Sequence, residues 1–380
     1  MYVDPEIYQL ERERIFRRTW QYVGHEHQVS EPGAYLSATI AGEPVVICRG
    51  EDGRLRGFYN TCSHRGAILT EAERGRCGGR FRCMYHGWTY DLEGRLIGVP
   101  HVEAYGASFR REAYHLVPIR VETLAGMIFA ALDPVVNSLE EFLGDAAPYL
   151  RKYGSNTEVI GRLRYLYSGN WKLWHENFAD NYHPEFVHKL VRDMYVGYEA
   201  QGTNHQLDPG HGLLIWPAIR PHFERYQAGL QQASGLEIDL SRNANWDFSP
   251  FVGQPAQEEL VLTLFPNFDF ASFYGASIEL RVVQPLAVDR TRVDLYVLGR
   301  KDDSPEIRRW RLERSASWLA SHGKVAADDL EALHRCQKGL TAQVGRQVDI
   351  NRGHKPGKVG EARDEYSIRS FYAAWRQYMK

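Results

Sequence analysis

Two short loops, each pairing one cysteine with one histidine, constrain the fold of this chain more than any other feature. They are Cys62-Ser63-His64 and Cys83-Met84-Tyr85-His86. Thiolates and imidazoles are ligands for soft and borderline metals. The loops lie among short, β-prone runs divided by glycine, at residues 43–49, 55–60, 80–83 and 88–97. We therefore predict a small antiparallel β-domain over residues 40–155 around a metal site, with residues 1–39 and 156–380 forming a second domain.

Ligand type alone leaves two kinds of metal site open. A structural zinc site also uses two Cys and two His at short spacings. A zinc finger, however, keeps its Cys pair and its His pair apart, whereas each loop here combines both residue types. With His64-Arg65-Gly66 in the first loop and Tyr85-His86-Gly87-Trp88 in the second, the pattern resembles the Rieske [2Fe-2S] motif.

That resemblance implies that Cys62 and Cys83 hold one iron and that His64 and His86 hold the other. Neutral imidazoles in place of thiolates raise the reduction potential of such a cluster. Three further cysteines match no ligand position and are interpreted as small apolar fillers: Cys48, Cys77 and Cys336.

A second group of metal-binding residue types lies in the aromatic-rich stretch 170–189. Asp180, His183 and His188 fall within nine residues. On an ideal helix Asp180 and His183 share a face, but five residues turn His188 away by about 140°. Pro184 should break the helix and bias His183 away from helical backbone angles. We expect this break to bring the two imidazoles together.

The stretch from Glu176 to His188 resembles the mononuclear iron motif of the Rieske ring-hydroxylating oxygenases. The resemblance implies a 2-His-1-carboxylate site for Fe(II), with His183 and His188 as ligands. Asp180 then matches the aspartate that links a Rieske histidine of one subunit to an iron-bound histidine of the next. The third iron ligand would be an aspartate on a C-terminal helix.

Asp328 and Asp329 are the two candidates for that third ligand. Asp328 followed by Glu331 fits a capping box, so Asp328 is expected to cap its own helix. Asp329 is then free to bind iron, and we predict it as the ligand. Without the resemblance, both would be read as solvated acids at a helix start.

The remaining chain predicts an α+β fold. Residues 261–265, 277–283 and 292–298 are expected to be antiparallel strands of a central sheet flanked by helices over 305–323 and 328–339. A terminal amphipathic helix carries Ile368, Phe371, Tyr372, Trp375 and Met379 on one face.

The resemblance implies a terminal oxygenase that passes electrons from the Rieske cluster to Fe(II) and inserts oxygen from O2 into an aromatic substrate, such as an aromatic acid. Three alternatives stay open: a monooxygenase or demethylase acting on an aromatic ether or an amine, a pure Rieske electron-transfer protein, and a zinc-stabilised binding module. Asp180 argues mildly against the amine version, whose members often carry Glu there. The candidate substrate contacts are Asn177, Phe178, Val187, Leu190, Phe265, Asn267, Phe273, Arg220 and Arg225.

No glycine-rich dinucleotide fingerprint is present, so a separate flavin reductase, with or without a ferredoxin, should supply electrons. The resemblance implies a homotrimer, or an α3β3 assembly with a small subunit. The net charge of −2 gives no sign of nucleic-acid binding. No apolar run is long enough for a membrane span, and residues 1–20 lack a signal-peptide core, so we expect a cytoplasmic protein.

Overall fold

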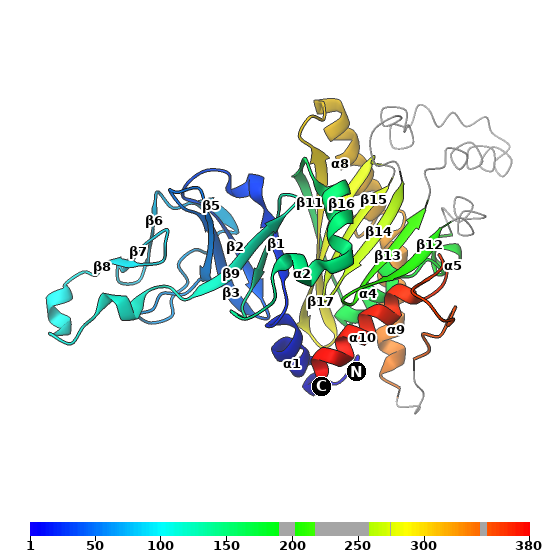
Figure 1. Cartoon of the computed structure of the whole chain (residues 1–380), viewed down its shortest axis with the longest axis horizontal. Helices are drawn as coiled ribbons and strands as arrows, with labels where there is room; N and C mark the ends of the chain where they lie inside the picture. The colour runs from blue at the N-terminus through cyan, green and yellow to red at the C-terminus, as the bar shows by residue number, and fades with distance from the viewer. Residues whose placement is uncertain (190–201, 217–257, 274, 343–347) are drawn as a thin grey trace. The chain divides into compact units, whose positions relative to one another are not determined.

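The computed structural model describes residues 1–189, 202–216, 258–273, 275–342 and 348–380. The chain forms two compact units, one of Leu10–Phe142 and one of Met1–Gln9 with Leu143–Lys380. Antiparallel sheets form the framework of both (Figure 1). Among the described residues, no helix is long and apolar enough to cross a lipid bilayer.

The smaller unit is built from antiparallel strands. Seven form a sheet in the order β1-β10-β9-β4-β3-β2-β5, and a second sheet has the order β6-β7-β8. The strands are β1 (Gln21–His25), β2 (Ala34–Ile40), β3 (Glu43–Arg49), β4 (Leu55–Tyr59), β5 (Arg74–Arg76), β6 (Arg80–Arg82), β7 (Thr89–Asp91), β8 (Leu96–Gly98), β9 (Pro118–Leu124) and β10 (Met127–Ala131). The helical segments are α1 (Pro5–Glu11), η1 (Arg12–Phe16), η2 (Glu26–Val29), η3 (Val102–Tyr105), η4 (Arg111–Tyr114) and α2 (Leu139–Leu143), of which α1 and α2 run across the unit boundary.

Alternation along β3 divides the apolar core of this unit in two. Val46 and Cys48 belong to the buried cluster that also contains Cys62 and Cys83. Their neighbours on β3, including Ile47, belong to a cluster on the opposite face. The metal-binding loops therefore rest on one face of the sheet, and Cys48 lies beneath them as a buried filler.

The division into units differs from the expected boundaries at residues 40 and 155. Strand β1 pairs with β10, with Gln21 opposite Ala130, and β2 pairs with β3. Residues 10–39 therefore belong with the smaller unit. A local sequence pattern does not reveal which distant strand an element will pair with.

The larger unit contains an antiparallel sheet in the order β11-β17-β16-β15-β14-β13-β12-β18. The strands are β11 (Thr157–Tyr167), β12 (Thr203–Leu207), β13 (His211–Trp216), β14 (Glu259–Leu264), β15 (Phe268–Phe273), β16 (Ser277–Ala287), β17 (Arg290–Arg300) and β18 (Val359–Glu361). The helices are η5 (Gly144–Ala146), α3 (Ala147–Gly154), α4 (Trp171–Ala179), α5 (Pro184–Val187), α8 (Pro305–Leu319), α9 (Ala326–Leu340) and α10 (Tyr366–Met379).

Helices α8 and α10 pack on the same face of this sheet. The strand register puts Gly161, Glu279 and Gly212 on one face. A Cβ atom at Gly161 would lie 2.4 Å from Leu312 of α8, and one at Gly212 would lie 2.3 Å from Ser367 of α10. Glycine at these two positions lets both helices approach the sheet closely.

The predicted α+β fold with two antiparallel domains is confirmed. Helices α8, α9 and α10 occupy the three segments predicted to be helical. Phe371 of α10 is fully buried, and burial of such a side chain contributes about 1.5–3 kcal/mol.

Candidate active site

The two Cys/His loops share one backbone shape. In the first, Cys62 N–H donates to Ala67 O and Gly66 N–H donates to Cys62 O, both at 2.8 Å. In the second, Cys83 N–H donates to Trp88 O at 2.8 Å and Gly87 N–H to Cys83 O at 3.0 Å. Both glycines have positive φ, at 70° and 72°, which strains other residue types. Two similar turns therefore present two similar pairs of metal donors.

The thiols lie inside this pair of loops and the imidazoles lie toward solvent. Cys62 and Cys83 are each 2% exposed, whereas His86 is exposed. The rings of His64 and His86 lie 4.7 Å apart between centroids, and Trp88 stacks on His64 at 4.8 Å. Burial, together with the nearby His86 and Arg65, lowers the pKa of His64 and favours the neutral imidazole that a metal requires. Its Nδ1 atom is buried and has no hydrogen-bond partner within the described chain.

This donor set fits a two-iron cluster better than a single zinc ion. Four ligands of one zinc ion would lie within a few Å of one another. In the part of the chain that the structure describes, the group of three or more possible metal ligands within 4.8 Å of one another is His183, His188 and Asp329. The two Cys/His loops do not form such a group there. Thiols on one side and imidazoles on the other suit a cluster with one pair on each iron.

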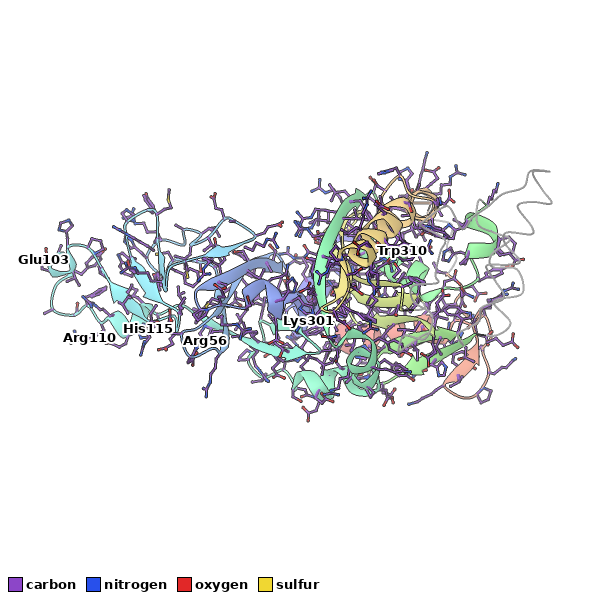
Figure 2. The ribbon with its side chains drawn as sticks, turned by 90° about the horizontal axis from the view of Figure 1, so that it is seen from above. Arg56, Glu103, Arg110, His115, Lys301 and Trp310 are labelled. Atoms are coloured by element: carbon purple, nitrogen blue, oxygen red, sulfur yellow. The ribbon has the colours of Figure 1, made fainter. Side chains whose placement is uncertain are left out.

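An aromatic segment covers one side of the loops. Tyr105, Phe109 and Tyr114 contact the Trp88 ring at 5.3–6.0 Å between centroids. Figure 2 shows Glu103 and Arg110 at the outer end of this segment and His115 on its return. A depression of about 340 Å³ lies beside it, lined by His86, Trp88, Pro100, His101, Ala104 and Tyr105. The segment covers Trp88 and leaves His86 exposed.

Asp180 links α4 to α5. Helix α4 ends before it, and its backbone is extended (φ −104°, ψ 126°). Its Oδ1 accepts from Tyr182 N–H at 2.7 Å, and its Oδ2 accepts from His183 N–H at 3.1 Å. The same Oδ2 lies 3.1 Å from His183 Nδ1. One carboxylate thus shapes the turn and orients the imidazole.

The expected local geometry was wrong in two respects. Asp180 and His183 do not share a helix, because the chain leaves helical geometry at Asp180. His183 has helical backbone angles (φ −65°, ψ −32°) despite the following Pro184. The break therefore precedes His183, and Pro184 begins α5, a position where its missing N–H costs nothing.

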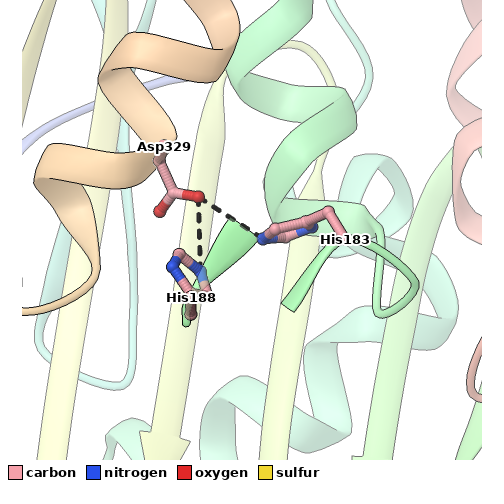
Figure 3. Close-up of side chains that lie close together, drawn as sticks. All are labelled: His183, His188 and Asp329. Carbon is pink, nitrogen blue, oxygen red and sulfur yellow. Dashed lines mark ion pairs between the residues drawn. The ribbon is translucent and has the colours of Figure 1, made fainter. Parts of the chain in front are cut away.

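His183, His188 and Asp329 converge (Figure 3). Asp329 Oδ1 lies 3.4 Å from Nε2 of each histidine. Metal–ligand bonds of about 2.1 Å would put neighbouring ligands about 3 Å apart, so the spacing fits three ligands on one face of an ion. Asp328 instead lies 3.7 Å from His188 Nδ1.

The capping argument for Asp329 was wrong, although Asp329 is the aspartate that joins the group. Helix α9 has Val325 at its N-cap, with no side-chain hydrogen bond there. Asp328 therefore does not cap the helix, and both aspartates lie in the first turn.

Charges in this group favour a cation. Burial lowers the pKa of His183, but hydrogen bonds and charges from Asp180 and Asp329 raise it to about 9. Burial raises the pKa of Asp329, but His183 outweighs it and leaves that pKa below its ordinary value. The pKa of His188 is lowered, chiefly by burial. A proton held on His183 occupies the place that a metal cation would take.

The predicted substrate contacts divide into four sets. Asn177 hydrogen-bonds Asp329, and Phe178 and Phe273 pack on an apolar cluster that includes Trp216 and Ala271. Phe265 instead stacks on α10, 5.4 Å from Tyr378, and Asn267 donates to Val283 O at 2.8 Å, so both serve the packing of the sheet. Val187 is half-buried at the end of α5. Leu190, Arg220 and Arg225 lie outside the described residues.

Sequence reasoning missed three buried charged residues behind Phe178: Asp269, Glu279 and Arg281. Glu279 and Arg281 alternate with apolar residues in a strand that is buried on both faces. Charged side chains are rare at such buried positions unless they have a partner. Their alternation with apolar residues was therefore the sequence pattern that could have revealed them.

Comparisons with known proteins identify the family of both domains. A family model of the Rieske [2Fe-2S] domain matches residues 19–120, and one of the ring hydroxylating alpha subunit (catalytic domain) matches residues 154–380. The chain is 30% identical to toluate 1,2-dioxygenase subunit alpha of Pseudomonas putida, over 93% of this chain and 81% of that one. It is 30% identical to 2-aminobenzenesulfonate 2,3-dioxygenase subunit alpha of Alcaligenes sp, over 100% and 92%. Naphthalene 1,2-dioxygenase from Rhodococcus sp. superposes with a TM-score of 0.83 at 26% identity, covering 100% of this chain and 93% of that one. The chain therefore belongs to the ring-hydroxylating alpha subunits, oxidoreductases that combine a Rieske [2Fe-2S] domain with a mononuclear iron domain.

Proposed function

We propose that this chain is the terminal oxygenase subunit of a multicomponent system and hydroxylates an anionic aromatic ring with oxygen from O2. The observation that carries this proposal is the gathering of His183, His188 and Asp329 within 4.8 Å, in a chain that also holds a Rieske domain. Two imidazoles and one carboxylate are the ligand set of non-heme Fe(II) oxygenases.

The protein side chains fix the two metal sites. Fe(II), when bound, supplies open positions for O2. His183 and His188 offer Nε2 and Asp329 offers Oδ1. Asp180 accepts from Nδ1 of His183, so Nε2 of that ring is the atom that would lose its proton and bind the metal. At the cluster, the unpaired Nδ1 of His64 is the corresponding donor atom.

Electrons would pass between copies of the chain. Exposed aromatic side chains adjoin each site: Tyr85 beside His86, and Tyr182 and Phe186 beside Asp180. We infer a head-to-tail homotrimer in which Asp180 faces His86 of a second copy and accepts a hydrogen bond from it. A flavin reductase, with or without a ferredoxin, would reduce the cluster.

The apolar cluster around Phe178 suits a flat ring. Trp216, Val261 and Ala271 are buried there, and Phe273 packs beside them. Apolar walls with a few polar groups are typical of small-molecule sites. The two relatives named for toluate and 2-aminobenzenesulfonate act on anionic aromatics, which supports an aromatic acid here.

Metal analysis and single turnover test the proposal together. The purified holoenzyme should contain about three iron and two sulfide per chain, two of the iron in the cluster and one at the His-His-Asp site. The enzyme is reduced chemically, which removes the need for its natural reductase, and exposed to 18O2 with a panel of aromatic acids, neutral aromatics and quaternary amines. Labelled hydroxylated product from an aromatic acid supports the proposal.

Other outcomes of this experiment assign the chain elsewhere. Two iron with no product would indicate electron transfer alone, and zinc without sulfide would indicate a binding module. Product from an amine or ether alone would indicate the monooxygenase or demethylase alternative. Native mass spectrometry separates a homotrimer from an α3β3 assembly, and a monomer that turns over in steady state would contradict the electron route.

A further inference from the structure

Strand β16 carries a buried ion pair on one face of the sheet. Glu279 and Arg281 lie two residues apart, so their side chains point to the same face. They are 1% and 4% exposed, and Arg281 Nη2 lies 3.0 Å from Glu279 Oε2. A buried guanidinium on a sheet interior is costly unless every donor finds an acceptor.

The acid of this pair is satisfied, whereas the guanidinium is not. Ser277 donates to Glu279 Oε1 at 2.6 Å, and Ser315 of α8 lies 3.4 Å from the same atom. Arg281 Nη1 is buried and has no hydrogen-bond partner in the described part of the chain. An unpaired buried donor needs an explanation, and a role in ligand binding is one.

Arg281 lies beside the apolar cluster that we propose contacts the substrate ring. Its Cζ atom is 4.0 Å from the ring centroid of Phe178, which packs on the apolar cluster described above. Burial raises the pKa of Tyr165, and the charges of Arg281 and Asp329 act on that pKa in opposite directions. Both charges are therefore within electrostatic range of this buried tyrosine.

Asp269 faces Arg281 on the neighbouring strand. The two residues are opposite each other in the β15–β16 register. Both carboxyl oxygens of Asp269 are buried without a hydrogen bond in the described part of the chain. Burial raises the pKa of Asp269 well above its ordinary value, although Arg281 opposes the shift. Burial therefore favours the protonated form of Asp269, whose O–H can donate a hydrogen bond.

Other ionisable groups around Asp269 do not neutralise Arg281 further. His175 of α4 lies 3.5 Å away, and burial together with His211 lowers its pKa to about 3, so it is uncharged. Glu279 is already engaged by two hydroxyls and one guanidinium nitrogen. Arg281 Nη1 and the carboxyl group of Asp269 are thus buried polar groups on adjacent strands that have no hydrogen-bond partner in the described part of the chain.

We propose that Arg281 Nη1 and the Asp269 carboxylic acid form the subsite that binds the anionic group of the substrate. The inference rests on the proposed function and names the chemistry that selects its substrate. A carboxylate or a sulfonate offers two oxygens, one for each donor, and charge-assisted bonds of this kind are the stronger ones. Phe178 covers the guanidinium face and would lie beside the substrate ring.

Calorimetric titration of the anaerobic, iron-loaded holoenzyme tests the subsite without turnover. The probes are benzoate, benzenesulfonate and benzamide, which is neutral and close to benzoate in shape. Wild type should bind both anions more tightly than benzamide. Arg281→Gln should weaken anion binding about 10- to 100-fold and change benzamide binding less than about threefold. Arg292→Gln removes a positive charge from the adjacent strand β17 and is the matched control, expected to leave all three affinities unchanged.

A second variant keeps the test decisive if Arg281→Gln does not fold. Asp269→Asn retains a donor and cannot ionise, so it should bind benzoate as wild type does at neutral pH. Wild type should lose benzoate affinity as the pH rises through the raised pKa of Asp269, because the carboxyl group then gains a negative charge, and Asp269→Asn should not. Equal losses for benzoate and benzamide in Arg281→Gln, or a wild type with no preference for anions, would overturn the subsite. Failure of the proposed function is distinguishable, because it would appear as missing iron or missing oxygenated product in wild type.

Discussion

Helix α8 takes part in two ion pairs that have the same N···O distance but differ in solvent exposure. Arg311 Nε lies 2.7 Å from Asp303 Oδ2, and Arg309 Nε lies 2.7 Å from Glu313 Oε1. The side chains of Arg311 and Asp303 are 0% and 3% exposed, whereas those of Arg309 and Glu313 are 80% and 44% exposed. We therefore expect burial to determine how much each ion pair contributes to the free energy of unfolding.

Asp303→Asn should destabilise the larger unit strongly. Arg311 Nη2 also bonds Asp303 at 3.1 Å, and the new amide would put a donor where the guanidinium needs an acceptor. Removing one partner of a buried pair costs about 3–5 kcal/mol. For a unit of roughly 250 residues, each kcal/mol lowers the midpoint by about 2–4 °C, so a loss of about 6–20 °C is expected.

Thermal unfolding followed by near-ultraviolet circular dichroism measures this difference. Glu313→Gln is the matched control and should leave the midpoint unchanged, because an exposed pair contributes little. Replacing both buried partners, with Asp303→Leu and Arg311→Met, should recover most of the loss. Equal shifts for Asp303→Asn and Glu313→Gln would refute the reasoning from burial.

Three further predictions concern the metal sites. Asp329→Ala should lower the iron content from about three to about two per chain while sulfide stays at about two, and a fully loaded variant would contradict its role as a ligand. Asp180→Asn should keep both metals yet stop steady-state product formation, because the electron route loses its bridging carboxylate; normal turnover would exclude that role. In metal-free protein the pKa of His183 is raised to about 9. Protonation of His183 therefore stabilises the fold fully at pH values below the ordinary pKa of histidine, and this stabilisation is lost as pH rises through about 9. Urea unfolding across this pH range should show that loss without metal and none with metal bound.

Short sequence patterns were sufficient to predict those parts of the site whose residues lie close together in the sequence. The cluster loops each span a few residues and depend on a glycine four places after the cysteine, so their spacing reveals them. The pairing of His183 with His188 was likewise visible, although the break that produces it precedes Pro184. The resemblance pointed to an aspartate on a C-terminal helix, and Asp329 was chosen over Asp328 by a capping argument that was wrong, because a capping pattern does not determine where a helix starts once tertiary packing intervenes.

Long-range packing explains the remaining differences. Phe265 and Asn267 have the composition of pocket residues, but α10 covers one and the β16 backbone engages the other. Sequence alternation predicts which residues share a face and leaves open which helix will cover that face. The same limit applies to β1, whose partner β10 is far along the chain.

The origin of the three converging donors has a kinetic consequence. His183 and His188 flank α5, whereas Asp329 comes from the first turn of α9. The site therefore exists only while these two helices stay packed together, and a bound cation adds its binding free energy to that contact. Loss of the cation to a chelator should then proceed at the rate at which α9 opens, well before the sheet unfolds. Amide hydrogen exchange in the first turn of α9 would report the same opening event, so the lifetime of the bound ion and the protection of that turn should change together.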